Sequence, residues 1–242
     1  MAQVRPGGAA ETEAILTRGE VTQIAEVVAG SNRVFQVRLE TEGKALTAVY
    51  KPARGERPLW DFPPQTLYRR EAATYVVDRA LGWGLVPPTV ARRDGPLGPG
   101  SMQEWVAEPP EDATPDRGQL EAELRRLAAL DVLVNNGDRK AAHLLLDPGL
   151  HLRGIDHGVT FSAEFKLRTV LADLGGQLVP EEAMADLASL LGDHDRLGVL
   201  QASLLRLLDR DEVAAFRRRA LELRRSGRYP LLDPFWGRPF GR

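Results

Sequence analysis

The chain has 242 residues, of which 43% are hydrophobic and 27% are charged, and its 32 basic and 34 acidic side chains leave a net charge of -2 at pH 7. This composition suffices for a sizeable core but is too weakly basic for nucleic-acid binding through bulk charge, and the lack of cysteine excludes disulfides and thiolate chemistry. No apolar run approaches the roughly 18 residues of a transmembrane segment, and the first residues lack the pattern of a secretory signal, so we expect a cytoplasmic protein.

The first part of the chain has the pattern of a β-rich lobe. Residues 1–13 are small, polar and rich in Gly and Ala, which predicts a flexible N-terminus. Within 14–106, β-branched and aromatic runs separated by turn signals predict a hairpin over 19–39 and strands within 46–50, 86–90 and 102–106. Apolar residues at helical spacing predict one helix over 67–81, which would end at Gly82.

The second part has a mainly helical pattern. Residues 107–118 are acidic, Pro-rich and without periodicity, which predicts a linker before a lobe over 119–242. Helices are expected over 120–134, 181–191, 193–208 and 211–226, and short strands over 144–146 and 151–155. The sequence thus predicts an α+β fold, with a β-rich N-lobe that contains one helix and a mainly helical C-lobe.

The densest cluster of polar residues in an apolar setting lies within 130–146. An apolar helix is expected to end at Asn135-Asn136-Gly137, because Asn and Gly favour a left-handed turn. The polar residues that follow are Asp138, Arg139, Lys140 and His143. Because apolar runs flank the cluster on both sides, we expect these groups to line a cleft, and a solvated turn at the helix end is the alternative.

Three further features could carry chemistry. Asp156 follows an apolar strand and precedes Gly158, as metal-binding aspartates often do, although Asp and Gly are also common turn residues. Lys51 ends an apolar strand and could pair with Glu71 in the next helix; a surface lysine is the alternative. The backbone of the turn Gly30-Ser31-Asn32 could cradle a phosphate, or the turn could simply close a hairpin.

Together these features have one economical explanation, an ATP-dependent phosphotransferase. Such an enzyme needs a polar turn over the phosphates, a lysine held by a glutamate, a carboxylate near the acceptor hydroxyl and a carboxylate on Mg²⁺. All four occur in the required chain order, first in the β-rich lobe and then in the helical lobe.

Seven short motifs, each weak alone, occur in an order that is specific. They are Gly30-Ser31, Tyr50-Lys51-Pro52, Glu71-Ala72 with Val77-Asp78, Val86-Pro87-x-Thr89, Gly100-Ser101-Met102-Gln103, Asp131-x4-Asn136-x-Asp138-Arg139 and Ile155-Asp156-x-Gly158. With these motifs, residues 20–225 resemble the phosphatidylinositol 3-/4-kinase-like branch of the protein-kinase-like fold, and most of all the type II phosphatidylinositol 4-kinases. The chain is also similar to a group of actinobacterial proteins related to those kinases.

The resemblance implies a role for each matching residue. On the nucleotide side, Lys51 would contact the α- and β-phosphates, Glu71 would orient Lys51, and Ser31 and Asn32 would lie over the phosphates. The hinge that receives adenine would comprise Gln103, Glu104 and Val106. On the catalytic side, Asp138 would position or deprotonate the acceptor hydroxyl and Asp156 would hold Mg²⁺. The residues that would brace the catalytic turn are Asn136, Arg139 and Asp131.

The main departure from that family is His143. Five residues after the catalytic aspartate these kinases usually place an asparagine, which is a second metal ligand. A neutral imidazole suits Mn²⁺ better than Mg²⁺. His143 therefore ligates metal, only forms a hydrogen bond, or marks weakened catalysis, and the last reading favours a pseudokinase that binds nucleotide without transfer. Transfer of AMP to a protein is a third hypothesis.

The acceptor is the least constrained part of the prediction. The resemblance implies an inositol lipid, but a fold does not fix its acceptor, so a lipid, a protein and a small alcohol all stay open. The sequence shows no polybasic anchor, and a peripheral membrane contact through the segment 159–168 remains one option. The expected ligands are ATP and Mg²⁺, with Mn²⁺ as the alternative metal.

Overall fold

The computed structural model describes residues 8–27, 32–41 and 43–232. The chain forms two compact units. Unit 1 comprises Met1–Tyr75 and Pro87–Trp105, and unit 2 comprises Val76–Val86 and Val106–Arg242. Each unit is built from two stretches of chain, whereas the lobes expected from the sequence are continuous. The helix α2 (Leu67–Leu81) contributes its first part to unit 1 and its last part to unit 2.

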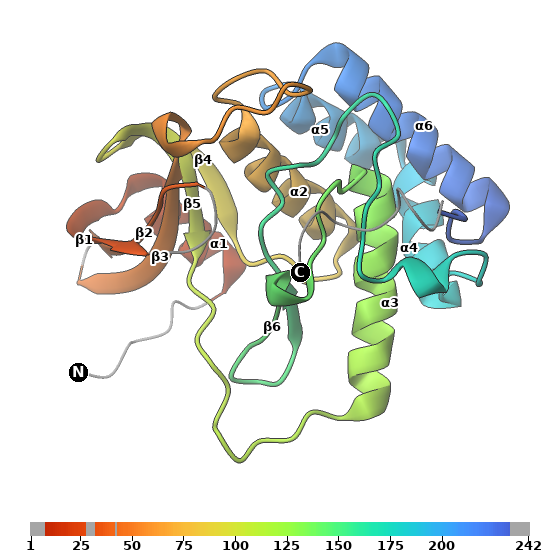
Figure 1. Cartoon of the computed structure of the whole chain (residues 1–242), viewed down its shortest axis with the longest axis horizontal. Helices are drawn as coiled ribbons and strands as arrows, with labels where there is room; N and C mark the ends of the chain where they lie inside the picture. Colours follow the sequence, from red (N-terminus) through yellow and green to blue (C-terminus); the bar gives the residue numbers. More distant parts are fainter. Residues whose placement is uncertain (1–7, 28–31, 42, 233–242) are drawn as a thin grey trace. The chain divides into compact units, whose positions relative to one another are not determined.

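Unit 1 is built on a five-stranded antiparallel sheet in the order β1-β2-β3-β5-β4 (Figure 1). The strands are β1 (Glu20–Val27), β2 (Val34–Thr41), β3 (Lys44–Pro52), β4 (Thr89–Gly95) and β5 (Gly98–Glu104). Side chains on β2 and β3 alternate between more and less buried positions, as they do in strands with one covered face. The buried members form the core with Met102 of β5; they are Phe35, Val37, Leu39, Leu46, Ala48 and Tyr50.

The helix α1 (Ala9–Arg18) packs against this sheet. The structure differs here from the sequence-based expectation, because residues 9–13 are helical rather than flexible. Ile15 and Leu16 are almost completely buried in the same core cluster as β2 and β3. Ala and Glu, which dominate the first turns of α1, are strong helix formers, and packing of Ile15 and Leu16 supplies the stability that a short isolated helix lacks.

Unit 2 is mainly helical (Figure 1). Its helices after α2 are α3 (Arg117–Val134), α4 (Glu181–Gly192), α5 (His194–Leu204) and α6 (Arg210–Ser226). A short hairpin of β6 (Leu144–Leu146) and β7 (Leu152–Gly154) lies between α3 and α4 in the chain. The helix α6 packs against α3 and α4, and the ring centroids of Phe161 and Phe216 lie 6.0 Å apart in the unit's core. Unit 2 thus has the helical architecture expected for 119–242.

The ends of the elements follow local capping chemistry. The helix α3 begins at Arg117, within the expected linker, because the carboxylate of Asp116 accepts a hydrogen bond from the backbone N–H of Gln119 and caps the helix. The carboxylate of Asp193 caps α5 in the same way through the N–H groups of Asp195 and Arg196. Between β5 and α3 the chain has no helix or strand.

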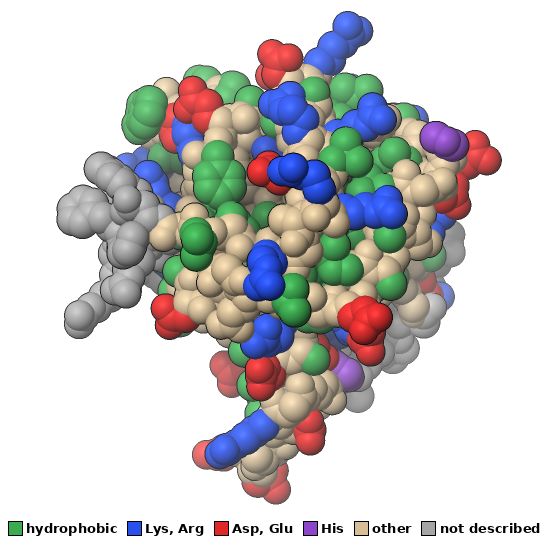
Figure 2. Space-filling model, turned by 90° about the vertical axis from the view of Figure 1, so that its right-hand side faces the viewer, with side chains coloured by type: hydrophobic (Ala, Val, Ile, Leu, Met, Phe, Trp, Pro, Cys, Tyr) green, Lys and Arg blue, Asp and Glu red, His purple; other side chains and the backbone are tan. Residues whose placement is uncertain are grey.

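The face drawn in Figure 2 carries basic, acidic and hydrophobic side chains interspersed with one another. A surface mixed in this way has no strong field of one sign. Of the helices in the described part of the chain, none is both long enough and apolar enough to cross a membrane.

Candidate functional site

Unit 1 contains the ion pair that the sequence suggested. Lys51, near the end of β3, places its Nζ 2.5 Å from Oε1 of Glu71 in α2. The Glu71 side chain is 3% exposed and that of Lys51 is 19% exposed. The pair is therefore held largely out of water, where charge interactions are stronger than at an open surface, while part of the lysine stays accessible.

Local contacts within unit 1 fix the helix that carries Glu71. The carboxylate of Glu56 accepts hydrogen bonds from the backbone N–H groups of Leu67 and Tyr68, which are the first two residues of α2. A carboxylate at this end of a helix satisfies otherwise unpaired N–H groups and complements the helix dipole. Burial raises the pKa of Glu56, and these two N–H groups act in the opposite direction.

Of the two predicted phosphate-turn residues, Ser31 lies outside the described residues and Asn32 lies inside them. The Oδ1 of Asn32 accepts a hydrogen bond of 2.8 Å from the N–H of Arg57. The next residue, Arg33, donates its own N–H to the carbonyl of Gly55 and its side chain to Glu26. The end of the β1–β2 turn is therefore tied to the segment that follows β3.

The predicted hinge residues are partly engaged by unit 1 itself. The side-chain amide of Gln103 donates to Oγ1 of Thr89 on the neighbouring strand, and both side chains are buried. The N–H of Glu104 donates to the carbonyl of Pro88. Val106 is the first residue of the second stretch of unit 2. The side chain of Gln103 thus has a structural hydrogen bond within unit 1, and the predicted role of this segment as an adenine hinge stays a prediction.

In unit 2, α3 ends in the left-handed turn that Asn135-Asn136-Gly137 predicted. Asn135 has a φ of 55° and its N–H bonds back to the carbonyl of Val132. Its side-chain amide donates to the carbonyls of Ser162 and Glu164 and accepts from the N–H of Lys166. One asparagine therefore ties the turn to the segment that follows Asp156, a role that the sequence analysis did not assign.

A fully buried ion pair braces the turn. Arg139 donates from Nε and Nη2 to the two carboxylate oxygens of Asp131, at 2.9 Å each, and both side chains are 0% exposed. Asn136 bridges this pair to the turn, because its amide donates to Asp131 and its Oδ1 accepts from the N–H of Asp138. Bidentate, charge-assisted hydrogen bonds of this kind fix geometry as well as charge. The backbone of Asp138 is held in place while its carboxylate stays partly exposed.

Asp156 follows β7 and is likewise accessible. Its side chain is 45% exposed, its φ is 59°, and its Oδ2 lies 3.2 Å from Nε2 of His143. Burial lowers the pKa of His143, and the carboxylates of both Asp156 and Asp138 act against that shift. Both predicted carboxylates are thus near enough to His143 to influence its charge, and the imidazole is neutral at neutral pH.

The hydrogen bonds of His143 suggest its tautomer. The N–H of Lys140 donates to Nδ1 over a long distance of 3.4 Å, so the ring proton lies on Nε2 and is directed at Asp156. In this arrangement the protonated Nε2 is the atom that lies 3.2 Å from Oδ2 of Asp156. Metal ligation through Nε2 would require the other tautomer.

These donors fit a divalent cation that is bound together with a nucleotide. Within residues 8–27, 32–41 and 43–232, no three His, Asp or Glu side chains gather into a metal cage. A cation of this kind needs only one or two protein carboxylates, since phosphate oxygens and water complete its shell. Asp156 can supply the carboxylate.

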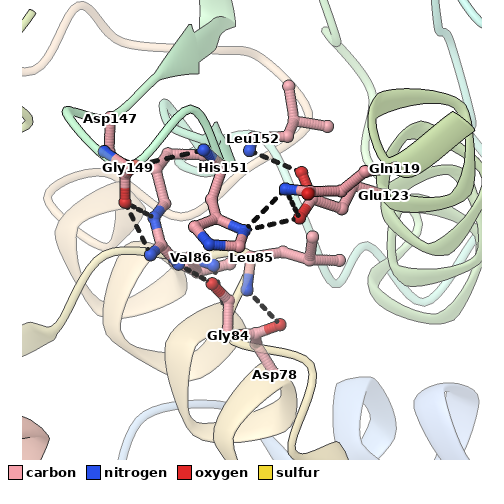
Figure 3. Close-up of polar contacts among 11 residues, drawn as sticks. Asp78, Gly84, Leu85, Val86, Gln119, Glu123, Asp147, Gly149, His151 and Leu152 are labelled. Carbon is pink, nitrogen blue, oxygen red and sulfur yellow. Dashed lines mark hydrogen bonds and ion pairs between the residues drawn. The ribbon is translucent and has the colours of Figure 1, made fainter. Parts of the chain in front are cut away.

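A second polar network holds the β6–β7 hairpin that leads to Asp156 (Figure 3). The buried carboxylate of Asp78 in α2 accepts the N–H groups of Leu85 and Val86, and the carbonyl of Leu85 accepts the N–H of Gly154. Nearby, Arg153 donates to Asp147 across the hairpin, and Glu123 of α3 accepts from His151 and from the N–H of Leu152. Asp78 matched a family motif, but its anchoring role required the structure.

Known proteins share this architecture. No family model matches the chain. It is similar to the Golgi casein kinase solved with Mn/ADP bound, with a TM-score of 0.61 and 15% identity over 90% of this chain and 75% of that one. It is also similar to the Helicobacter pylori proinflammatory kinase CtkA, with a TM-score of 0.54 and 9% identity over 88% of this chain and 94% of that one. The structure of hydra Fam20 with sugar has a TM-score of 0.53 and 14% identity, and the match covers 90% of this chain and 88% of that one. These likenesses show the fold.

A curated relative is closer in sequence. The protein Rv2133c of Mycobacterium tuberculosis (strain ATCC 25618 / H37Rv) is 36% identical in an alignment that covers 88% of this chain and 88% of that protein. The expected two-lobe α+β fold is confirmed, and the general resemblance to protein-kinase-like proteins holds. The finer resemblance to phosphatidylinositol 4-kinases stays a prediction. The chain has a protein-kinase-like fold and belongs to the family of Rv2133c.

Proposed function

We propose that the chain is an ATP-dependent kinase that transfers the γ-phosphoryl group of ATP to a hydroxyl acceptor. The observation that carries this proposal is the arrangement in unit 2, where two accessible carboxylates, Asp138 and Asp156, lie near one histidine on turns braced by a fully buried ion pair. An accessible carboxylate on a rigid support can act on a substrate, whereas the bracing groups are too buried to do so.

Each residue then has a defined task. Lys51, held by Glu71, neutralises phosphate charge. Asp138 orients the acceptor hydroxyl and takes its proton. The acceptor oxygen bonds to the γ-phosphorus as the bond from that phosphorus to the bridging oxygen breaks, and ADP leaves. Asp156 would hold a divalent cation, Mg²⁺ or Mn²⁺, which would supply further charge neutralisation on the phosphates.

The test is phosphate transfer from γ-labelled ATP. Three acceptor arms separate the open classes: vesicles that contain phosphatidylinositol, a protein extract, and free inositol as a small alcohol. We expect label in one arm with the wild type. Asp138→Ala should abolish transfer while leaving ATP binding intact, because Asp138 acts on the acceptor and not on the nucleotide. Transfer that survives in Asp138→Ala would contradict the assignment.

A pseudokinase is the second candidate, and the contact of 3.2 Å between Nε2 of His143 and Oδ2 of Asp156 favours it. That contact occupies the carboxylate that the kinase reading gives to the metal. Thermal shifts with ATP and either Mg²⁺ or Mn²⁺ distinguish the two, since stabilisation without label transfer in any arm supports a nucleotide-binding module. Label transferred from α-labelled ATP to protein would instead indicate AMP transfer.

A further inference from the structure

One buried guanidinium contacts the residues on both sides of Asp156. Nη1 of Arg139 donates to the carbonyl of Ile155 at 2.8 Å, and Nη2 lies 2.6 Å from Nε2 of His157. Arg139 and His157 are both 0% exposed, whereas the Asp156 side chain between them is 45% exposed. The peptide that presents Asp156 is therefore anchored inside unit 2 on either side of an accessible carboxylate.

The contact with Arg139 defines the state of His157. A guanidinium is always protonated and has no acceptor, so Arg139 is the donor and Nε2 of His157 is the acceptor. The ring is then neutral and carries its proton on Nδ1. The backbone beyond it is fixed as well, because Oγ1 of Thr160 donates to the carbonyl of His157 at 2.8 Å.

The backbone at Asp156 needs such support. Its φ of 59° is left-handed, a conformation that non-glycine residues adopt at an energetic cost and keep only where their surroundings enforce it. The carbonyl of Ile155 and the ring of His157 are the neighbours that Arg139 holds. Arg139 also directly follows Asp138, and its N–H donates to the carbonyl of Arg168. One residue thus contacts both neighbours of Asp156 and directly follows Asp138 in the chain.

We propose that His157 is a positioning residue for Asp156. Its Nε2 accepts a hydrogen bond from Arg139. This bond holds the peptide between Asp156 and His157 in the conformation that presents the Asp156 carboxylate to a divalent cation. This inference rests on the proposed metal role of Asp156. It assigns to His157 no contact with the substrate, the nucleotide or the metal.

The test compares two substitutions with different acceptors. In His157→Gln, the Oε1 atom can take the place of Nε2 and accept from Arg139. In His157→Leu, the side chain fills space but accepts nothing. Outer partners of metal ligands are typically worth about 10–100-fold in metal affinity. We expect Mn²⁺ binding in the presence of ADP, followed by electron paramagnetic resonance, to weaken by that factor in His157→Leu and to recover in His157→Gln.

The control is His194→Leu, which replaces an exposed histidine at the start of α5 and should leave Mn²⁺ binding unchanged. Equal Mn²⁺ binding in all variants would overturn the proposal, as would equal loss in His157→Leu and His157→Gln when both remain folded by circular dichroism. A kinase assay without label transfer would count against the proposed function but leave this comparison intact.

A second readout needs neither metal nor activity. Nitrogen-15 correlation spectra of histidine-labelled protein report which ring nitrogen carries the proton. We expect the Nδ1–H form for His157. The His157 signals are assigned by their absence from the spectrum of His157→Gln. A charged ring, or a proton on Nε2, would contradict the proposed hydrogen bond from Arg139.

Discussion

At the scale of single residues, His143 is the group through which the proposed metal preference of unit 2 can be tested. Burial lowers its pKa, while the negative charges of Asp156 and Asp138 oppose that shift. A neutral imidazole nitrogen is a softer donor than an amide or carboxylate oxygen, and it suits Mn²⁺ better than Mg²⁺. The departure from the asparagine expected at this position therefore has a measurable consequence.

We expect His143→Asn to move the metal preference from Mn²⁺ toward Mg²⁺, because an amide oxygen is a harder ligand. Thermal stabilisation by ADP with Mn²⁺ and with Mg²⁺ gives the ratio of the two metal effects, and His194→Asn, at an exposed histidine at the start of α5, is the matched control. A ratio that does not change in His143→Asn would show that His143 does not ligate the metal.

The buried pair of Asp131 and Arg139 makes a second prediction about single residues. In Asp131→Asn the Arg139 charge stays buried without its counter-ion, which typically costs about 3–5 kcal/mol. We expect a loss of that order in the free energy of unfolding, measured with urea. The joint replacement Asp131→Leu and Arg139→Met should cost less than Asp131→Asn, since it buries no charge.

The control for this comparison is Asp147→Asn, which weakens a partly exposed pair with Arg153 on the same unit and should cost about 1 kcal/mol or less. Equal losses in the free energy of unfolding in Asp131→Asn and Asp147→Asn would contradict the prediction that breaking the buried Asp131 pair costs more than weakening an exposed one.

At the scale of elements, Asp78 of α2 links stability to pH. Burial raises the pKa of Asp78 to about 6, even though the N–H groups of Val86 and Leu85 stabilise its charged form. The native carboxyl therefore holds a proton up to a higher pH than the unfolded one, whose pKa is near 4. The native state binds more protons between pH 4 and 6, so the stability contributed by Asp78 falls as the pH rises through that range.

We expect this fall to amount to roughly 3 kcal/mol, from 1.36 kcal/mol for each pKa unit. The measurement is the free energy of unfolding at several pH values from 4 to 7 for the wild type and Asp78→Asn. The wild type should lose more stability than the variant over this range. Parallel curves for the two proteins would contradict a raised pKa at Asp78.

The same elements show what local sequence can and cannot predict. Periodicity predicts α2 and α4 almost to the residue, since their apolar spacing and end signals agree. It does not predict α1, whose stability comes from Ile15 and Leu16 in the core of unit 1. The turn at Asn135 follows from residue type alone, but its hydrogen bonds to residues 162–166 depend on a segment distant in the chain.

The same distinction between local sequence and distant contacts applies to the residues of the candidate site. Residue type and order predict the pair of Lys51 and Glu71, which the structure contains. The tasks predicted for Asp138 and Asp156 stay predictions. The roles of His157 and Asp78 have no such signal, since a buried histidine and a buried aspartate in a helix are defined by their partners. Gln103 shows the converse, for its side chain is engaged by Thr89 rather than aimed at a ligand.

At the scale of the whole molecule, the proposed nucleotide binding should increase the free energy of unfolding. A ligand that binds only the native state stabilises it by RT ln(1 + [L]/Kd), which is about 2.7 kcal/mol at 100 times Kd. We expect ADP with Mn²⁺ to raise the melting temperature of the wild type, measured by calorimetry. Lys51→Met should reduce that shift, because the largely buried ammonium of Lys51 is the cation assigned to the phosphates.

The matched control lies on the same strand. Lys44 begins β3, is exposed, and pairs with Glu11 of α1 at the surface. Surface pairs contribute little to stability, so Lys44→Met should melt near the wild type and keep its full ADP shift. Equal shifts in Lys51→Met and Lys44→Met would remove Lys51 from the nucleotide site, whereas a shift lost only in Lys51→Met ties ADP binding to one buried charge pair and not to the general charge of the chain.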